Sequence, residues 1–153
     1  GATAAGNVHI PGGVVQVVQG TYASSVTISA SSYTNSGLAG TITPKFSNSK
    51  IMILVNMVGA GVVVSGSHDA EGRFQIIRGS TVILTARQRG YDYGASGTIQ
   101  FSQQALLWLD SPATTNATTY TLQMNRDSST GSIRMNQDQV TGGSSITLME
   151  IAQ

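Results

Sequence analysis

The stretch Thr-Tyr-Thr-Leu-Gln-Met, residues 119–124, alternates polar and apolar side chains one by one. Successive side chains of a β-strand point to opposite faces, so this stretch predicts a strand whose apolar face covers a core. The same alternation recurs in two other segments, with apolar residues at Val26, Ile28 and Ala30 and at Ile99 and Phe101. These segments predict sheets that are packed on one side and exposed to water on the other.

Short β-like runs continue from Val14 to the end of the chain, interrupted roughly every 8 to 15 residues by turn-forming clusters. The clusters hold Gly, Asn, Asp and Ser, which tolerate left-handed or side-chain-capped backbone, at residues 35–37, 47–49, 127–131 and 141–143. This rhythm predicts an all-β, antiparallel β-sandwich over residues 14–153, preceded by a short flexible N-terminal arm or linker, residues 1–13. Residues 102–109 leave a short helix as an alternative, because good helix formers follow Ser102, a potential N-cap.

The composition fits a single domain with an unusual surface. The 153 residues are 40% hydrophobic, enough for one core, but only 10% are charged, against about 25% in ordinary soluble domains. Ser and Thr supply about a quarter of the chain and Gly another 18 residues, which favours strands and turns.

Charge and cysteine usage exclude several classes of protein. The net charge is +1, and two lysines and six arginines are scattered along the chain, so no basic stripe predicts nucleic-acid binding. There are no cysteines, which excludes disulfides and thiolate sites. No apolar run approaches the roughly 20 residues of a membrane span, so we expect no membrane insertion.

Three runs are apolar at consecutive positions, so both of their faces need a cover. They are residues 51–55, 82–84 and 105–109. The cover could come from a neighbouring subunit, which would make the protein an oligomer, or the runs could be central strands beneath long loops. The pattern alone leaves both interpretations open.

No motif of catalysis or of cofactor binding is present. The two histidines, His9 and His68, are not accompanied by a GxSxG motif. The densest set of potential metal ligands is His68, Asp69 and Glu71, whose spacing does not suit a closed zinc site; a solvated turn is favoured over a weak calcium site. We therefore predict no catalytic residue, no metal site and no cofactor.

Glu150 is an acid inside the predicted last strand, residues 146–151, on the same face as Ile146 and Leu148. Two environments are compatible with this position. The carboxylate is either half-buried and hydrogen-bonded, or it lies at the frayed edge of the strand. We favour the frayed edge.

The best candidate for a recognition surface is the segment Arg87–Gly94, where Tyr91 and Tyr93 stand among glycines and charges. Tyr supplies rigid contact area at low entropic cost, and Arg supplies forked hydrogen bonding. The predicted receptor-binding residues are the exposed polar and aromatic residues of this segment and of the other polar loop, namely Arg89, Tyr91, Asp92, Tyr93, His68 and Asp69. The alternative is an ordinary hairpin whose tyrosines fold back over the sheet edge.

Three stretches carry a resemblance to a known family: GLAGTITP with SKIMILV at 37–55, LDSPATTNATTYTLQ at 109–123, and SSITLMEI at 144–151. They are similar to β-sandwich domains of tail-fibre and other structural proteins of tailed phages, notably marine ones. The resemblance implies a jelly-roll-like sandwich, homotrimeric, at the end of a fibre or on the surface of a particle. It carries no enzymatic residues.

Three functions follow from these expectations. The leading one is a non-enzymatic virion protein, a fibre-tip or surface-adhesion domain whose loops contact a host glycan or protein receptor. The second is a capsid or tail decoration protein that binds other virion proteins through residues 1–13. The third is a carbohydrate-binding trimeric module. The shortness of the arm leaves open whether the chain is a fragment of a longer fibre or a decoration attached directly to the virion.

Overall fold

The computed structural model describes residues 10–63, 70–90, 99–128, 130–137 and 141–153, and these residues form ten strands and no helix. The strands, in chain order, are β1 (Val14–Tyr22), β2 (Val26–Ile28), β3 (Thr34–Ile42), β4 (Lys50–Val63), β5 (Ala70–Arg78), β6 (Thr81–Gly90), β7 (Ile99–Asp110), β8 (Thr118–Arg126), β9 (Ser132–Met135) and β10 (Ser144–Ile151). The predicted all-β fold is confirmed, and the helical alternative for residues 102–109 is wrong, because they lie within β7. No described helix could cross a membrane.

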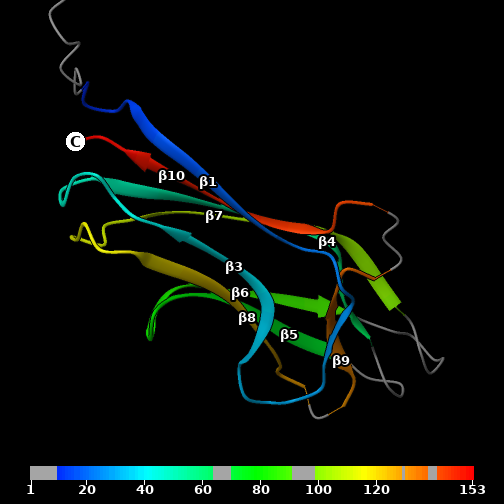
Figure 1. Cartoon of the computed structure of the whole chain (residues 1–153). Helices are drawn as coiled ribbons and strands as arrows, with labels where there is room; N and C mark the ends of the chain where they lie inside the picture. The colour runs from blue at the N-terminus through cyan, green and yellow to red at the C-terminus, as the bar shows by residue number, and fades with distance from the viewer. Residues whose placement is uncertain (1–9, 64–69, 91–98, 129, 138–140) are drawn as a thin grey trace, which may run out of the picture.

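The strands form two antiparallel sheets, which face each other as in a sandwich (Figure 1). Sheet A has six strands in the order β1-β10-β4-β9-β2, with β7 on the other edge of β4; sheet B has the order β3-β8-β5-β6. The predicted antiparallel β-sandwich is therefore confirmed. Its jelly-roll-like connectivity stays a prediction.

Strand β4 is the longest element and organises sheet A. One of its edges pairs with β7, and the other pairs first with β10 over Lys50–Asn56 and then with β9 over Gly61–Val63. A register shift between Met57 and Ala60 separates the two halves. Gly59 makes this possible, since its φ of 51° favours glycine and a Cβ would lie 2.1 Å from the carbonyl oxygen of Gln137.

The core lies between the inner faces of the two sheets and follows the predicted period of two. Tyr120, Leu122 and Met124 of β8 are all 0% exposed, as the alternation at 119–124 predicts. Ile28 of β2 is buried too, but Ala30 is exposed and lies beyond the end of that strand, so its predicted place in the core is wrong. The side chains of Ile99 and Phe101 lie outside the described residues.

Only one of the three doubly apolar runs belongs to a central strand. In β4, the inner residues Ile51, Ile53 and Val55 are buried. The runs 82–84 and 105–109 instead belong to β6 and β7, which are edge strands of sheets B and A. The interpretation of these two runs as central strands is therefore wrong, and their exposed apolar side chains have no cover among the described residues.

Glu150 is buried, so its predicted position at a frayed edge is wrong. Strand β10 lies between β1 and β4, and its inward face carries Glu150 into the sandwich, where the residue is 0% exposed. Gln16 Nε2 donates to Glu150 Oε2 at 2.6 Å, and the backbone amides of Lys45 and Phe46 donate to Oε1 at 2.8 and 3.1 Å. Burial by itself would raise the pKa of Glu150, but these hydrogen bonds to the charged form lower it below its ordinary value.

The two opposite ends of the sandwich are called here the arm end and the loop end, and each is defined by the strand ends that meet there. At the arm end, the first residue of β1, Val14, pairs with Ile151, which in turn pairs with Lys50. At the loop end, Val63 pairs with Ile99, and Ala70 pairs with Gly90. The 14 residues of β4 connect the two ends, which are thus roughly 40 Å apart (Figure 1).

The buried carboxylate gives a prediction for stability. We expect Glu150→Gln to lower the free energy of unfolding by about 1–3 kcal/mol at pH 7, because three donors lose a charged acceptor. The pKa of Glu150 is lowered in the folded state, so its contribution is complete above the ordinary value of 4.5 and is lost as the pH falls through the lower folded value.

Urea unfolding of both proteins at pH 7 and at pH 3 measures this contribution. The difference between the free energies of unfolding of wild type and variant should be smaller at pH 3 than at pH 7, because pH 3 lies below the ordinary pKa of 4.5 and the contribution of the carboxylate declines there. An equal difference at both pH values would contradict the assigned charge state.

Candidate binding surface

Of the six predicted receptor-binding residues, the structure describes Arg89, near the last residue of β6. Its side chain is 64% exposed, in agreement with an accessible position at the loop end. The other five, His68, Asp69, Tyr91, Asp92 and Tyr93, lie outside the described residues. The described residues on either side of them, at Val63, Ala70, Gly90 and Ile99, all belong to the loop end.

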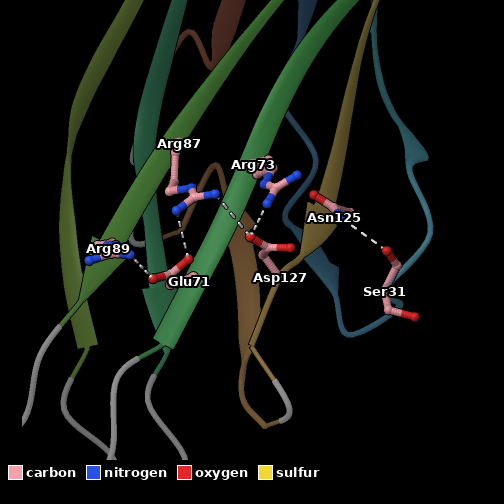
Figure 2. Close-up of polar contacts among 7 residues, drawn as sticks. All are labelled: Ser31, Glu71, Arg73, Arg87, Arg89, Asn125 and Asp127. Carbon is pink, nitrogen blue, oxygen red and sulfur yellow. Dashed lines mark hydrogen bonds and ion pairs between the residues drawn. The ribbon is translucent and has the colours of Figure 1, made fainter.

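Arg89 belongs to a group of five charged residues on the outer face of sheet B, which we call the arginine network (Figure 2). Its members are Glu71, Arg73, Arg87, Arg89 and Asp127.

The register of the β5–β6 hairpin creates the network. Glu71 lies opposite Arg89, and Arg73 opposite Arg87, so all four side chains share one face. That face points outward because the alternate residue Phe74 is buried in the core. Asp127 follows the end of β8 and joins the group because its backbone amide donates to the carbonyl oxygen of Glu71 at 2.8 Å.

Opposite charges alternate through the network. Arg73 Nη2 lies 2.5 Å from Asp127 Oδ2, and Arg87 Nη2 lies 3.7 Å from the same oxygen. Arg87 Nη1 is 3.4 Å from Glu71 Oε2, and Arg89 Nη2 is 2.6 Å from Glu71 Oε1 (Figure 2). The hydrogen bond to Asp127 raises the pKa of Arg73. Each carboxylate therefore orients two guanidinium groups.

The cations of the network are more accessible than its anions. The side chains of Glu71 and Asp127 are 17% and 24% exposed, whereas those of Arg73, Arg87 and Arg89 are 34%, 46% and 64% exposed. With three arginines and two acids the network carries one net positive charge. Because the acids lie deeper, the surface offers guanidinium groups to the solvent.

A row of side-chain amides borders the network, one step further along the strands. Gln75 Nε2 donates to Gln123 Oε1 at 2.7 Å, and Gln123 Nε2 donates to Asn35 Oδ1 at 2.7 Å. Gln75 follows Arg73 on the same face of β5, so the charged and amide groups are continuous. Beside them, Asn125 Nδ2 donates to the carbonyl oxygen of Ser31 at 2.9 Å (Figure 2).

A second charged group, Asp110 with Arg78 and Tyr120, lies toward the arm end; Asp110 and Tyr120 are buried, and the side chain of Arg78 is 25% exposed. Tyr120 donates its hydroxyl to Asp110 Oδ2 at 2.8 Å, and Arg78 Nη1 lies 3.1 Å from the same oxygen. Burial, together with the hydrogen bond to Asp110, raises the pKa of Tyr120. Since Asp110 ends β7 of sheet A and the other two belong to sheet B, this group connects the sheets.

The possible metal ligand Glu71 is ion-paired with two arginines. Across residues 10–63, 70–90, 99–128, 130–137 and 141–153, no three His, Cys, Asp or Glu side chains form a group that could hold a metal ion. The proposed partners of Glu71 in a weak calcium site, His68 and Asp69, lie outside these ranges.

The outer face of sheet A has the opposite character. Its outward side chains at the arm end form the apolar face, composed of Val17, Met52, Leu54, Leu107, Leu109 and Met149. Met52, Leu107 and Leu109 line a shallow hollow of about 330 Å³ together with Trp108, which is 44% exposed at the sheet edge.

No model of a known protein family matches the chain, and no curated protein matches it in sequence. The fold and its two unlike outer faces therefore define the class, an antiparallel β-sandwich with one charged and one apolar face. The resemblance to phage structural domains stays a prediction.

The sequence pointed to Arg89 as an accessible residue but not to Arg73 and Asp127 as members of the same network. A usable signal exists in the two charge pairs at alternate positions, Glu71 with Arg73 and Arg87 with Arg89, since alternate residues share a strand face. Nothing in the sequence places Asp127 beside them, because that contact depends on the pairing of β8 with β5 in sheet B.

The exposed fractions of the side chains predict that the arginine network contributes less to stability than the group around Asp110 does. We expect Arg87→Gln and Arg89→Gln each to change the free energy of unfolding by at most about 1 kcal/mol, because water screens half-exposed ion pairs. Asp110→Asn should cost about 2–3 kcal/mol, because it deprives Arg78 and Tyr120 of their shared anion. Urea unfolding measures all three, and a loss above about 2 kcal/mol for Arg89→Gln would assign the network a structural role.

Proposed function

We propose that this chain is a non-enzymatic structural domain of a bacteriophage virion, jelly-roll-like in topology, that contacts the host surface. The contact is made by the loop end, where Arg89 lies beside the paired strand ends Ala70 and Gly90. The observation that carries this proposal is the separation of the arm end from the loop end by the length of β4. One end can be attached to a particle while the other faces the host.

The arm end has features that suit attachment. Gly12 donates its amide to the carbonyl oxygen of Ala152 at 2.8 Å, and Ala152 donates to Gly13 at 2.9 Å, so the last residues of the arm are tied to the C-terminus. Just before them, Ile10 is 64% exposed. These contacts also support the second candidate, a capsid or tail decoration protein that binds other virion proteins through residues 1–13.

Antibody labelling and adsorption test the proposal together. We expect gold-labelled antibodies against the chain to mark phage particles, and the purified chain to inhibit adsorption of that phage to its host. A variant lacking residues 1–13 should still inhibit adsorption but should no longer join the particle. Unlabelled particles would exclude a virion protein, and labelled particles with unhindered adsorption would favour the decoration protein.

We further propose that the apolar face assembles the chain into a homotrimer. Around Met52 and Leu54 the outward side chains of β1, β10, β4 and β7 carry no charge among the described residues, with Lys50 only at the rim. Identical copies therefore meet there without like-charge repulsion. In the described part of edge strand β7, residues 102–109 hold neither a charge nor a proline, the usual protections against pairing.

The size of the face suits a second copy better than a small ligand. Four strands about 4.8 Å apart and eight residues long cover roughly 450 Å² in projection. A standard interface takes about 800 Å² of accessible surface from each partner. The whole face and its β7 edge, and not the hollow alone, are therefore needed for a stable contact.

Light scattering of the purified chain tests the trimer. We expect a mass of about 48 kDa, three times the 15.9 kDa chain, at micromolar concentration. Leu107→Glu should convert the protein to monomers, whereas Val82→Glu, a similarly exposed apolar residue on β6 of the other sheet, should leave the mass unchanged. A wild-type monomer or dimer would contradict the proposed trimer.

A further inference from the structure

We propose that the outer face of sheet B at the loop end is a binding site for an acidic glycan, a sugar polymer that carries carboxylate, sulfate or phosphate groups. Arg87 and Arg89 bind the anionic group, and Glu71 and Asp127 position the guanidinium groups. The inference rests on the proposed host contact and names the class of molecule that this contact recognises.

The accessible donors of the network are the first argument. A guanidinium has five N–H donors, and the described contacts of Arg89 engage one of its three nitrogens. The acidic groups lie beneath the arginines, with Glu71 only 17% exposed. An anion that approaches from the solvent therefore meets guanidinium groups before it meets a carboxylate.

Preorganisation is the second argument. Ordering a free arginine side chain costs rotamer entropy. Here Glu71 holds both Arg87 and Arg89, and Asp127 holds both Arg73 and Arg87, so part of this ordering precedes binding. The planar fork of arginine also matches carboxylate, sulfate and phosphate oxygens in pairs.

The amide row makes the site suitable for a sugar and not only for an anion. Sugar hydroxyls donate and accept hydrogen bonds at once, and Asn and Gln side chains do the same. Asn35 ends the row and is exposed, with its carbonyl oxygen engaged by Gln123. Gln75 itself is buried, at 7% exposed, so it orients Gln123, and the accessible amides of the row are those of Gln123 and Asn35.

A tyrosine at the start of β3 adds an apolar surface to the same region. Tyr33 is half-buried and directly precedes β3; after the larger effect of Asp127, it contributes to the raised pKa of Arg73, which places it near that guanidinium group. Aromatic rings offer flat apolar area at low entropic cost, against which the C–H face of a sugar can pack. The anionic, hydroxyl and apolar parts of an acidic sugar thus each have a matching group in the same region of sheet B.

Binding of the full chain to polymers of known chemistry tests the site. The probes are polygalacturonate for carboxylates, dextran sulfate for sulfates, a ribitol phosphate polymer for phosphates, and neutral dextran as the control. We expect salt-sensitive binding to at least one acidic polymer and none to dextran. Arg87→Gln and Arg89→Gln should each weaken that binding about tenfold.

Matched variants separate a built site from general attraction to positive charge. Lys50→Gln removes the same charge at the arm end and should change the affinity less than twofold. Glu71→Gln makes the chain more positive, so simple attraction would strengthen binding, whereas loss of guanidinium positioning should weaken it about threefold or more. Asn35→Ala should weaken binding of the acidic polymer without affecting weak binding of inorganic sulfate or phosphate.

The proposed glycan site and the proposed host contact can each fail without the other. Absence of binding to all three acidic polymers, tighter binding by Glu71→Gln, or equal effects of Lys50→Gln and Arg89→Gln would each overturn the glycan site. If the chain still inhibits phage adsorption in that case, the host contact stands and its chemistry lies elsewhere. If the chain binds acidic polymers but does not inhibit adsorption, the virion adhesion function fails while the site remains.

Discussion

The packing of alternate side chains of β4, β5 and β8 between the two sheets is the constraint on which the other features depend. Because the period of a strand is two residues, a slip of one position would turn every side chain to the opposite face. The phase that buries Phe74 and Ile76 is therefore the same phase that turns Arg73 and Gln75 outward. Core and candidate site are two consequences of one alternation, and neither can change register without the other.

Local patterns predicted the strands well, and long-range pairing decided what the patterns could not show. The alternation at 119–124 identified β8 because its inner residues Tyr120, Leu122 and Met124 all belong to the buried core. The environment of Glu150 was predicted wrongly because it depends on strand order. Its donors Gln16 and Lys45 are 134 and 105 residues away, and nothing near Glu150 in the sequence reveals them. The edge positions of β6 and β7 could not be predicted for the same reason, because the order of the strands in a sheet cannot be read from the sequence.

The candidate surface was predictable only in part. Turn composition led to Arg89, because a segment rich in Gly, Tyr and Arg predicts an accessible loop. The register between β5 and β6 sets the neighbours of Arg89, and the turn after β8 adds Asp127. Glu71 illustrates the difference. Beside His68 and Asp69 in the sequence it resembles a metal ligand in a turn, whereas in the fold it is a strand residue between two arginines.

The unlike outer faces of the two sheets are compatible with a single assembly. If copies of the chain meet through the uncharged face around Leu54 and Leu107, the face that carries Arg87 and Arg89 stays turned away from the contact. A trimer would then display three copies of the arginine network to one polymer chain or one cell surface. Individual exposed ion pairs bind weakly, but linked sites raise the overall affinity by about 10²–10⁴ without any new contact. A sandwich with few charges can therefore bind an acidic surface strongly when those charges are repeated by symmetry. Such an assembly requires that the apolar face and the charged face lie on opposite sheets, so that the contact between copies leaves the charged face accessible.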